Sequence, residues 1–223
     1  MKRLVAVCVT SVVLAAPVTS GVASAQVFCG GVEVTTFGSG TIVGTDQADV
    51  ILGGPGPDLI LAGAGDDVVC GGGGDDRIAG GVGDDFLLGD AGNDQLAGEA
   101  GEDALVGDDL ALGSIGNDAL DGGDGDDFLT GVFGDDRIAG GPGHDELYGG
   151  PGRDRLSGDD GDDLMFGNFG SDILLGGPGD DFIDGDSPRR GLLGGPTDVT
   201  PHTDVCGGGG GQNSVQNCEL VLR

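Results

Sequence analysis

Sixteen aspartates recur through the centre of the chain, almost always nine residues apart, and each is followed two positions later by an apolar side chain. A carboxylate is a hard oxygen ligand, and glycine-rich turns around it expose backbone carbonyl oxygens as further ligands. Calcium takes about six to eight such oxygens, whereas magnesium demands a tighter octahedral geometry. The spacing therefore predicts calcium ligands, and the candidates are Asp49, Asp58, Asp67, Asp76, Asp85, Asp94, Asp103, Asp109, Asp118, Asp127, Asp136, Asp145, Asp154, Asp163, Asp172 and Asp181.

These aspartates occupy position six of a nonapeptide unit. Position four is glycine in every unit except at Gln47, and position eight is always apolar. Complete units run from 44 to 106 and again from 113 to 184. The six residues 107–112 between them fit positions four to nine, with Asp109 at position six. The sequence thus predicts sixteen units, one of them truncated.

The elements that must position these carboxylates are short strands joined by glycine-rich turns. Glycine makes up 52 of the 223 residues, a density that opposes helix. Positions seven to nine predict a strand whose eighth side chain points inward, and positions one to six predict a turn. Two units form one 18-residue coil, so the sequence predicts an all-β parallel β-roll, or β-solenoid, of about eight coils. Aspartates would then stand in columns about 5 Å apart and repel one another unless cations lie between them.

The repeated motif resembles that of the repeats-in-toxin, or haemolysin-type, calcium-binding family, GGxGxDx-aliphatic-x. Gly71–Ala79 is a representative unit, and the resemblance covers residues 44–184. The resemblance implies a parallel β-roll in which each Ca²⁺ lies between the turns of units n and n+2. It also implies that the sixth-position aspartates are the ligands and that several ions bind.

The first 25 residues predict a secretory signal peptide. Lys2 and Arg3 precede an apolar run, and Ala23-Ser24-Ala25 is a small-residue cleavage site that leaves Gln26 as the new N-terminus. No other apolar stretch is long enough to span a bilayer. The predicted location is therefore extracellular, where disulfides form and calcium is abundant.

The formal net charge of −30 argues against nucleic acid as a partner, because a basic surface is missing. A disordered acidic tail is the alternative explanation of so many carboxylates. Such a tail would not keep one carboxylate and one aliphatic side chain in fixed phase over sixteen units. The phase therefore favours a folded calcium-bound array.

Residues 26–43 and 185–223 flank the predicted roll, and we expect them to form N- and C-terminal caps. The four cysteines outside the signal peptide permit three pairings. Cys70 lies at an outward position among apolar neighbours, so Cys29 can attach the N-terminal cap to it. The expected disulfides are Cys29–Cys70 and Cys206–Cys218.

No nucleophile, metalloprotease or phosphate-binding motif accompanies His144 and His202, and we predict that the chain is not an enzyme. The predicted function is a secreted calcium-binding module that folds on binding its ions. The alternative is a calcium-dependent adhesin that binds a cell surface or polysaccharide. Alternate units carry an apolar residue at position three, which serves either local packing or a partner; these residues are Ala64, Val82, Ala100, Ile115, Phe133 and Phe169.

Overall fold

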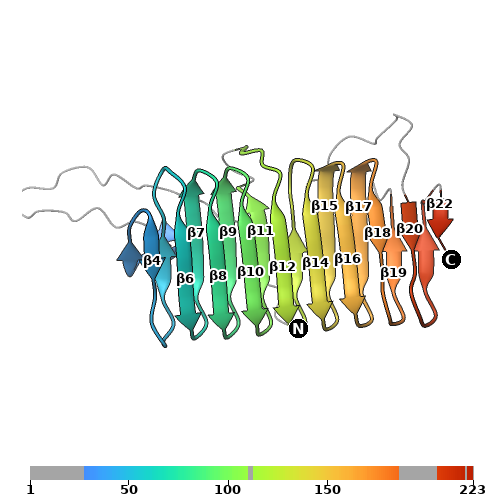
Figure 1. Ribbon diagram of the computed structural model, residues 1–223, viewed down its shortest axis with the longest axis horizontal. Coiled ribbons are helices and arrows are strands. Elements are labelled where there is room, and N and C mark those ends of the chain that lie inside the picture. Colours follow the sequence, from blue (N-terminus) through green and yellow to red (C-terminus); the bar gives the residue numbers. More distant parts are fainter. Residues whose placement is uncertain (1–27, 110–112, 186–204, 219, 223) are drawn as a thin grey trace, which may run out of the picture.

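A computed structural model describes residues 28–109, 113–185, 205–218 and 220–222, and within these ranges the chain contains strands and no helix. Two ten-stranded parallel sheets lie face to face along the long axis (Figure 1). We call them the odd and the even sheet, after the strand numbers. The odd sheet contains β3 (Thr36–Phe37), β5 (Val50–Leu52), β7 (Val68–Gly73), β9 (Phe86–Ala91), β11 (Ala104–Asp108), β13 (Phe128–Thr130), β15 (Glu146–Gly152), β17 (Leu164–Gly170), β19 (Phe182–Asp184) and β21 (Ser214–Gln216).

The even sheet is built in the same way from the alternate strands. Successive strands along the chain belong to opposite sheets, so each pair of strands completes one coil. This arrangement confirms the predicted all-β parallel β-roll of about eight coils. The even sheet contains β4 (Thr41–Val43), β6 (Leu59–Ala64), β8 (Arg77–Val82), β10 (Gln95–Ala100), β12 (Ala119–Asp124), β14 (Arg137–Pro142), β16 (Arg155–Asp160), β18 (Ile173–Leu175), β20 (Val205–Gly207) and β22 (Leu220–Leu222).

The core lies between the two sheets and consists mainly of eighth-position side chains, one row from each sheet. Leu87, Leu105 and Leu129 are fully buried on successive rungs of the odd sheet, and Ile78, Leu96 and Leu120 face them from the even sheet. The two rows run the length of the roll. The predicted inward direction of position eight is confirmed.

Many strands are longer than the three residues predicted. β6, β8 and β10 each continue through positions one to three of the next unit, and Gly63 pairs with Gly81 across the rungs. The backbone at positions one to three, which follows the inward side chain at position eight, therefore continues the parallel hydrogen bonding of the sheet. Only positions four to six remain outside these longer strands.

The prediction of a truncated unit at 107–112 is wrong. β10 pairs directly with β12, and β11 with β13, at an offset of 24 residues in place of 18. Asp108 pairs in register with Asp90, at position two of the turn, and Gly116 resumes the repeat at position four. Residues 109–114 are thus an insertion within one turn, and the roll has fifteen repeat units from 44 to 184. Six residues are too few to form a turn and cross the roll as well.

The insertion also changes the phase of everything after it, which overturns the single apolar line expected at position three. Ala64, Val82 and Ala100 are neighbours at the C-terminal ends of even strands. Phe169 instead lies in β17 of the odd sheet, beside Pro151. The six apolar residues are therefore divided between the two edges of the roll. Successive turns alternate between the edges, and the inserted residues do not count as a turn, so the residues after the insertion lie on the other edge.

The N-terminal flank folds onto the outer face of the odd sheet. β1 (Phe28–Cys29) and β2 (Val32–Glu33) form an antiparallel pair, and Cys29 is disulfide-bonded to Cys70. Cys29, Val50, Cys70 and Leu88 form a small second cluster, with Phe86 packed against it. The disulfide thus holds the β1–β2 pair on strands β5, β7 and β9.

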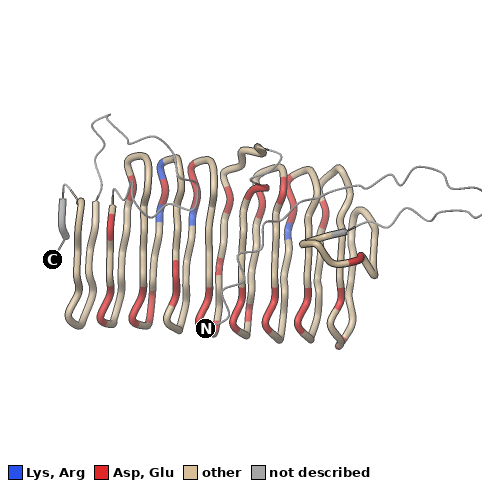
Figure 2. The backbone as a smooth tube through the Cα atoms, turned by 180° about the vertical axis from the view of Figure 1, so that it is seen from behind, with Lys and Arg blue, Asp and Glu red and all other residues tan. Residues whose placement is uncertain are grey.

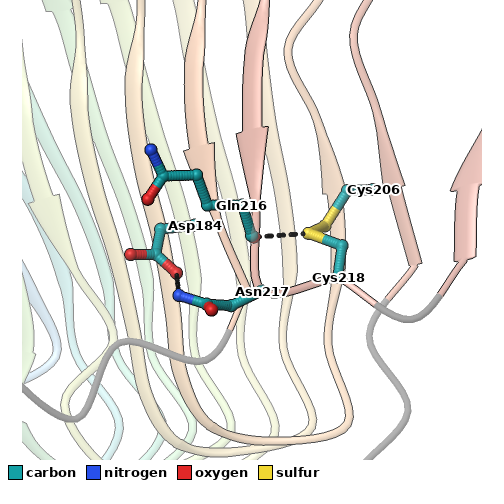
Figure 3. The surroundings of a disulfide bond; sticks show 5 residues. All are labelled: Asp184, Cys206, Gln216, Asn217 and Cys218. Atoms are coloured by element: carbon teal, nitrogen blue, oxygen red, sulfur yellow. Dashed lines mark hydrogen bonds between the residues drawn. A yellow bond between two sulfur atoms is a disulfide. The ribbon is translucent and has the colours of Figure 1, made fainter.

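The second disulfide, Cys206–Cys218, lies at the opposite end of the roll (Figure 3). Cys206 is fully buried in β20, and Asn217 donates a hydrogen bond from Nδ2 to Asp184 at 2.6 Å beside it. Both expected pairings are confirmed. The predicted signal peptide lies outside the described residues.

Candidate metal centres

The sixth-position aspartates form two ladders, one along each edge of the roll. In each ladder the backbone N–H of one aspartate donates to Oδ1 of the aspartate on the next rung, as Asp136 does to Asp154 at 2.9 Å. Figure 2 shows acidic segments recurring from rung to rung at the turns. The turns that lead into the even sheet form what we call the even edge, with Asp58, Asp76, Asp94, Asp118, Asp136, Asp154 and Asp172.

The odd edge, formed by the turns that lead into the odd sheet, has the same construction. Its donor–acceptor distances run from 2.7 Å at Asp49–Asp67 to 3.2 Å at Asp163–Asp181. The structure therefore places fifteen of the sixteen predicted site residues in two continuous ladders. Those of the odd edge are Asp49, Asp67, Asp85, Asp103, Asp127, Asp145, Asp163 and Asp181.

Asp109 is the exception. The N–H of Asp94 donates to Asp118 across 24 residues and passes over Asp109, which lies in the insertion. The backbone N–H of Asp109 donates to the Ser114 hydroxyl at 2.9 Å, and its side chain is 1 % exposed. The sequence placed Asp109 at position six because Asp109-Leu110-Ala111-Leu112 imitates the end of a unit.

The sequence analysis missed two residues that extend these ladders, one at the N-terminal end of the even edge and one at the C-terminal end of the odd edge. The N–H of Gly40 donates to Oδ1 of Asp58, so Gly40 holds position six of an additional rung before the first recognised unit. At the other end, Asp181 donates to Oδ1 of Asn213 at 2.8 Å. A usable signal existed for Asn213, because Val215 follows it at the core spacing.

The carboxylates are buried, and most leave one oxygen without a hydrogen-bond partner. Asp94, Asp136 and Asp154 are each 1 % exposed, and Oδ2 of each has no partner. A buried polar atom left unsatisfied costs about 1–3 kcal/mol, and more when it is charged. The same unsatisfied Oδ2 recurs at Asp67, Asp76, Asp85, Asp103, Asp118, Asp127, Asp145, Asp163 and Asp181.

Burial is the main cause of raised pKa values along both ladders. It is opposed by the hydrogen bond from the preceding rung and reinforced at most positions by neighbouring carboxylates. The pKa of Asp154 rises to about 9 and that of Asp118 to about 8. The pKa rises to about 7 for Asp85, Asp94, Asp136 and Asp145, and to about 6 for Asp76, Asp103, Asp127 and Asp163.

In most units the unsatisfied oxygen faces the glycine at position one of the same unit, and in several of them a backbone carbonyl of the next rung also approaches. A β-carbon at Gly71 would lie 2.5 Å from Oδ2 of Asp76 and 2.6 Å from the carbonyl oxygen of Gly89. At Gly71 a side chain would collide with both oxygens, so glycine leaves this space open. Carboxylate and carbonyl oxygens therefore converge beside turns of this kind.

This donor set suits a hard cation. Within the described residues no three acidic, histidine or cysteine side chains converge on one point, so a cation would take backbone carbonyls as well as carboxylates. Unsatisfied carboxylate oxygens beside exposed carbonyls are the ligands that calcium prefers. The residues present fit the ion that the spacing predicts.

A second, exposed ladder runs at position five in the opposite direction. The N–H of Glu102 donates back to Oδ1 of Asp84 at 3.0 Å, and the N–H of Asp162 donates back to Nδ1 of His144 at 2.9 Å. His144 thus takes the place of a carboxylate in this ladder, with Nδ1 as an acceptor. These contacts give it a structural position in the turn.

Comparison with protein families identifies the repeat. The model of the RTX calcium-binding nonapeptide repeat (4 copies) matches residues 36–69, 43–78, 71–105, 104–138, 130–165 and 157–187. A search of curated proteins found no match. In the part of the chain that the structure describes, no helix is long and apolar enough to cross a membrane.

Proposed function

The chain belongs to the family of RTX calcium-binding nonapeptide repeats, and from this premise we propose that it is a secreted module whose two aspartate ladders bind stacked Ca²⁺ ions and fold around them. The fifteen aspartates of the even and odd edges would be the carboxylate ligands. Backbone carbonyls of the glycine-rich turns would complete each site. The bound ions would supply positive charge between carboxylates of successive rungs.

The unsatisfied Oδ2 atoms are the observation that supports this proposal best. They recur on successive rungs, at buried positions, in a chain whose formal net charge is −30. Without a cation or a proton at each site, like charges about 5 Å apart oppose collapse. Cation binding therefore favours the folded roll over the unfolded chain.

The test is circular dichroism of the full mature chain, first stripped of metal and then titrated with CaCl₂ at pH 7.5. We expect β-structure to appear with calcium and to disappear on addition of EDTA. Magnesium at the same concentration is the control, and we expect it to have a smaller effect because of its tighter geometry. An unchanged β signal after chelation would overturn the proposal.

Export by the signal peptide of residues 1–25 is part of the proposal. The two disulfides support it, since disulfides persist in oxidising compartments. Expression of the full chain in a secreting host is the test, with N-terminal sequencing of the protein from the medium. We expect the mature chain to begin at Gln26. Retention of the intact N-terminus inside the cell would contradict it.

The outer face of the even sheet favours a second candidate function, binding of an acidic polysaccharide. An open groove of about 490 Å³ crosses strands β6 to β14, with Ala79, Ala97 and Ala139 along it. Exposed Arg77 and Arg137 line the same groove, together with the exposed Asp121. Figure 2 shows few basic segments among many acidic ones, with one of them several rungs away from the others.

Charge complementarity points to a polyanion in this groove, because cationic side chains are rare elsewhere in the described chain. The test is affinity electrophoresis of the calcium-loaded protein in polygalacturonate, with neutral dextran as the comparison. We expect retardation by the polyanion alone and its loss in the Arg77→Ser/Arg137→Ser variant. Arg153→Ser, an exposed turn arginine outside the groove, is the matched control. Equal retardation of all three proteins would refute this function.

A further inference from the structure

Two buried aspartates at the insertion do not belong to the sixth-position ladders. Asp90 and Asp108 occupy position two of adjacent turns and pair in register between β9 and β11. They are 2 % and 0 % exposed. Position two is glycine in most units, and the repeat motif does not use it as a ligand. These two side chains therefore require an explanation of their own.

Each of the two carboxylates keeps one oxygen without a partner. Oδ2 of Asp108 accepts hydrogen bonds from the N–H groups of Gly116 at 3.2 Å and Phe133 at 3.3 Å, while its Oδ1 has none. Oδ1 of Asp90 is likewise buried and unpartnered. Two such atoms on neighbouring rungs are destabilising unless something positive lies between them.

The backbone at Asp90 adds a second cost. Its φ is +72°, in the left-handed region that glycine adopts freely and a side chain rarely does. A buried carboxylate in a strained backbone position persists only where surrounding interactions hold it there. Asp159 has the same motif position and a similar φ of +68°, but its side chain is exposed and accepts a hydrogen bond from Ser157 at 2.8 Å. Burial with an unsatisfied oxygen distinguishes Asp90 from Asp159.

A third acidic residue lies beside the pair. Burial raises the pKa of Asp90, and the charge of Asp109 raises it further. Asp109 is 1 % exposed and begins the insertion. Asp90, Asp108 and Asp109 are thus all buried near the start of the insertion.

We propose that Asp90 and Asp108 bind one additional Ca²⁺ at the base of the insertion, outside the two ladders, with Asp109 adding negative charge to the site. Parallel strands are about 4.8 Å apart, and this spacing leaves room for a hard cation between carboxylates of adjacent rungs. Calcium, with its flexible coordination and Ca–O distances of about 2.3–2.6 Å, tolerates such a site better than magnesium does. Backbone carbonyls and water would complete the coordination. This inference extends the proposed function to a site that the repeat motif does not define.

The test compares the full mature chain with three variants by native mass spectrometry in calcium, which resolves species that differ by one ion. Asp90→Gly removes the carboxylate and suits the positive φ, so it does not threaten folding. Asp108→Asn keeps an acceptor for Gly116 and Phe133. Asp159→Gly is the matched control, because it relieves the same backbone conformation at an exposed site. We expect Asp90→Gly and Asp108→Asn to bind one ion fewer than wild type, and Asp159→Gly to bind the wild-type number.

Crystals of the calcium-loaded protein provide the independent readout. We expect an anomalous difference peak next to Oδ1 of Asp90 in wild type, and its loss in Asp90→Gly with the ladder peaks retained. Equal ion counts in wild type and Asp90→Gly, with no peak at Asp90, would overturn this inference and would show that the pair is neutralised by protons. Absence of all bound calcium from the wild-type protein would instead overturn the proposed function as a whole.

Discussion

Asp154 accepts a hydrogen bond from the backbone N–H of Asp136, 2.9 Å away on the neighbouring rung, while its other carboxylate oxygen has no partner. One oxygen therefore fixes the register between rungs, and the other is available to a proton or a cation. The same division of roles recurs along both edges of the roll. It determines how the roll should respond to acid, to mutation and to calcium.

Acid should stabilise the calcium-free roll. The pKa of Asp154 is about 9 in the folded chain against an ordinary value of 3.8, and burial is its main cause. Between these pH values the folded state binds protons that the unfolded state has released, so stability is greatest below about pH 4 and is lost as the pH rises toward 9. Circular dichroism of metal-stripped protein should show more β-structure at pH 5 than at pH 8, and a higher Tm wherever a thermal transition remains. A Tm that falls steadily on acidification over this range would contradict the raised pKa values.

Asp154→Asn should have opposite effects with and without calcium. The amide keeps an acceptor for Asp136 and removes the buried charge, so the metal-free roll should gain about 1–3 kcal/mol. In calcium the variant should lose at least one ion and about 3–4 kcal/mol, if free calcium is about 100–1,000 times Kd. Residual β-structure in EDTA, followed by circular dichroism, reports the first effect, and urea unfolding in CaCl₂ measures the second. Asp160→Asn, an exposed strand residue, should change neither; the same sign of effect in both solutions would rule out the ladder as the ion site.

Deletion of residues 109–114 should leave the roll intact. The deletion restores the 18-residue spacing between Asp94 and Asp118, which already pair at 2.8 Å across the longer segment. Shortening a loop by six residues changes closure entropy only slightly, so the free energy of unfolding in calcium should shift by less than about 1 kcal/mol. Loss of the cooperative transition would mean that these residues form part of a rung.

The two disulfides should contribute unequally. Cys29–Cys70 closes 41 residues and Cys206–Cys218 closes 12. Because loop entropy grows with length, Cys29→Ser/Cys70→Ser should cost about 1 kcal/mol more than Cys206→Ser/Cys218→Ser, within a range of about 2–4 kcal/mol for each. Urea unfolding in saturating calcium compares them, and the reverse order would show that native contacts at the C-terminal end outweigh the entropy difference.

The nine-residue period was sufficient to predict the roll, its core and the carboxylate ladders. Position eight carries an aliphatic residue in every unit, and this period excludes a helix and defines which side chain points inward. The disulfide pairing followed from the same phase, because Cys70 fell at an outward apolar position. These inferences depend only on local repetition.

The rest depends on contacts that repetition does not encode. Position nine faces outward as expected, but on the odd sheet it is covered: Leu88 is fully buried and Phe166 is 1 % exposed. Leu88 packs in the cluster around Cys29, and Phe166 stacks on Tyr148 with ring centroids 5.1 Å apart. Residues 107–112 match positions four to nine of a unit in residue type. They do not form a unit, because six residues are too few to form a turn and a strand that crosses the roll.

Ladder bonds join only turns on the same side of the roll, so the two edges share a core but exchange no sixth-position hydrogen bond. The roll therefore has two separate hydrogen-bond ladders that share one hydrophobic core. A defect at Asp136 reaches Asp118 and Asp154 directly, but it reaches Asp127 or Asp145 only through the aliphatic row between the sheets. The two ladders are thus connected only through the core, and at the C-terminal end of the odd-edge ladder the neutral Asn213 takes the place of an aspartate.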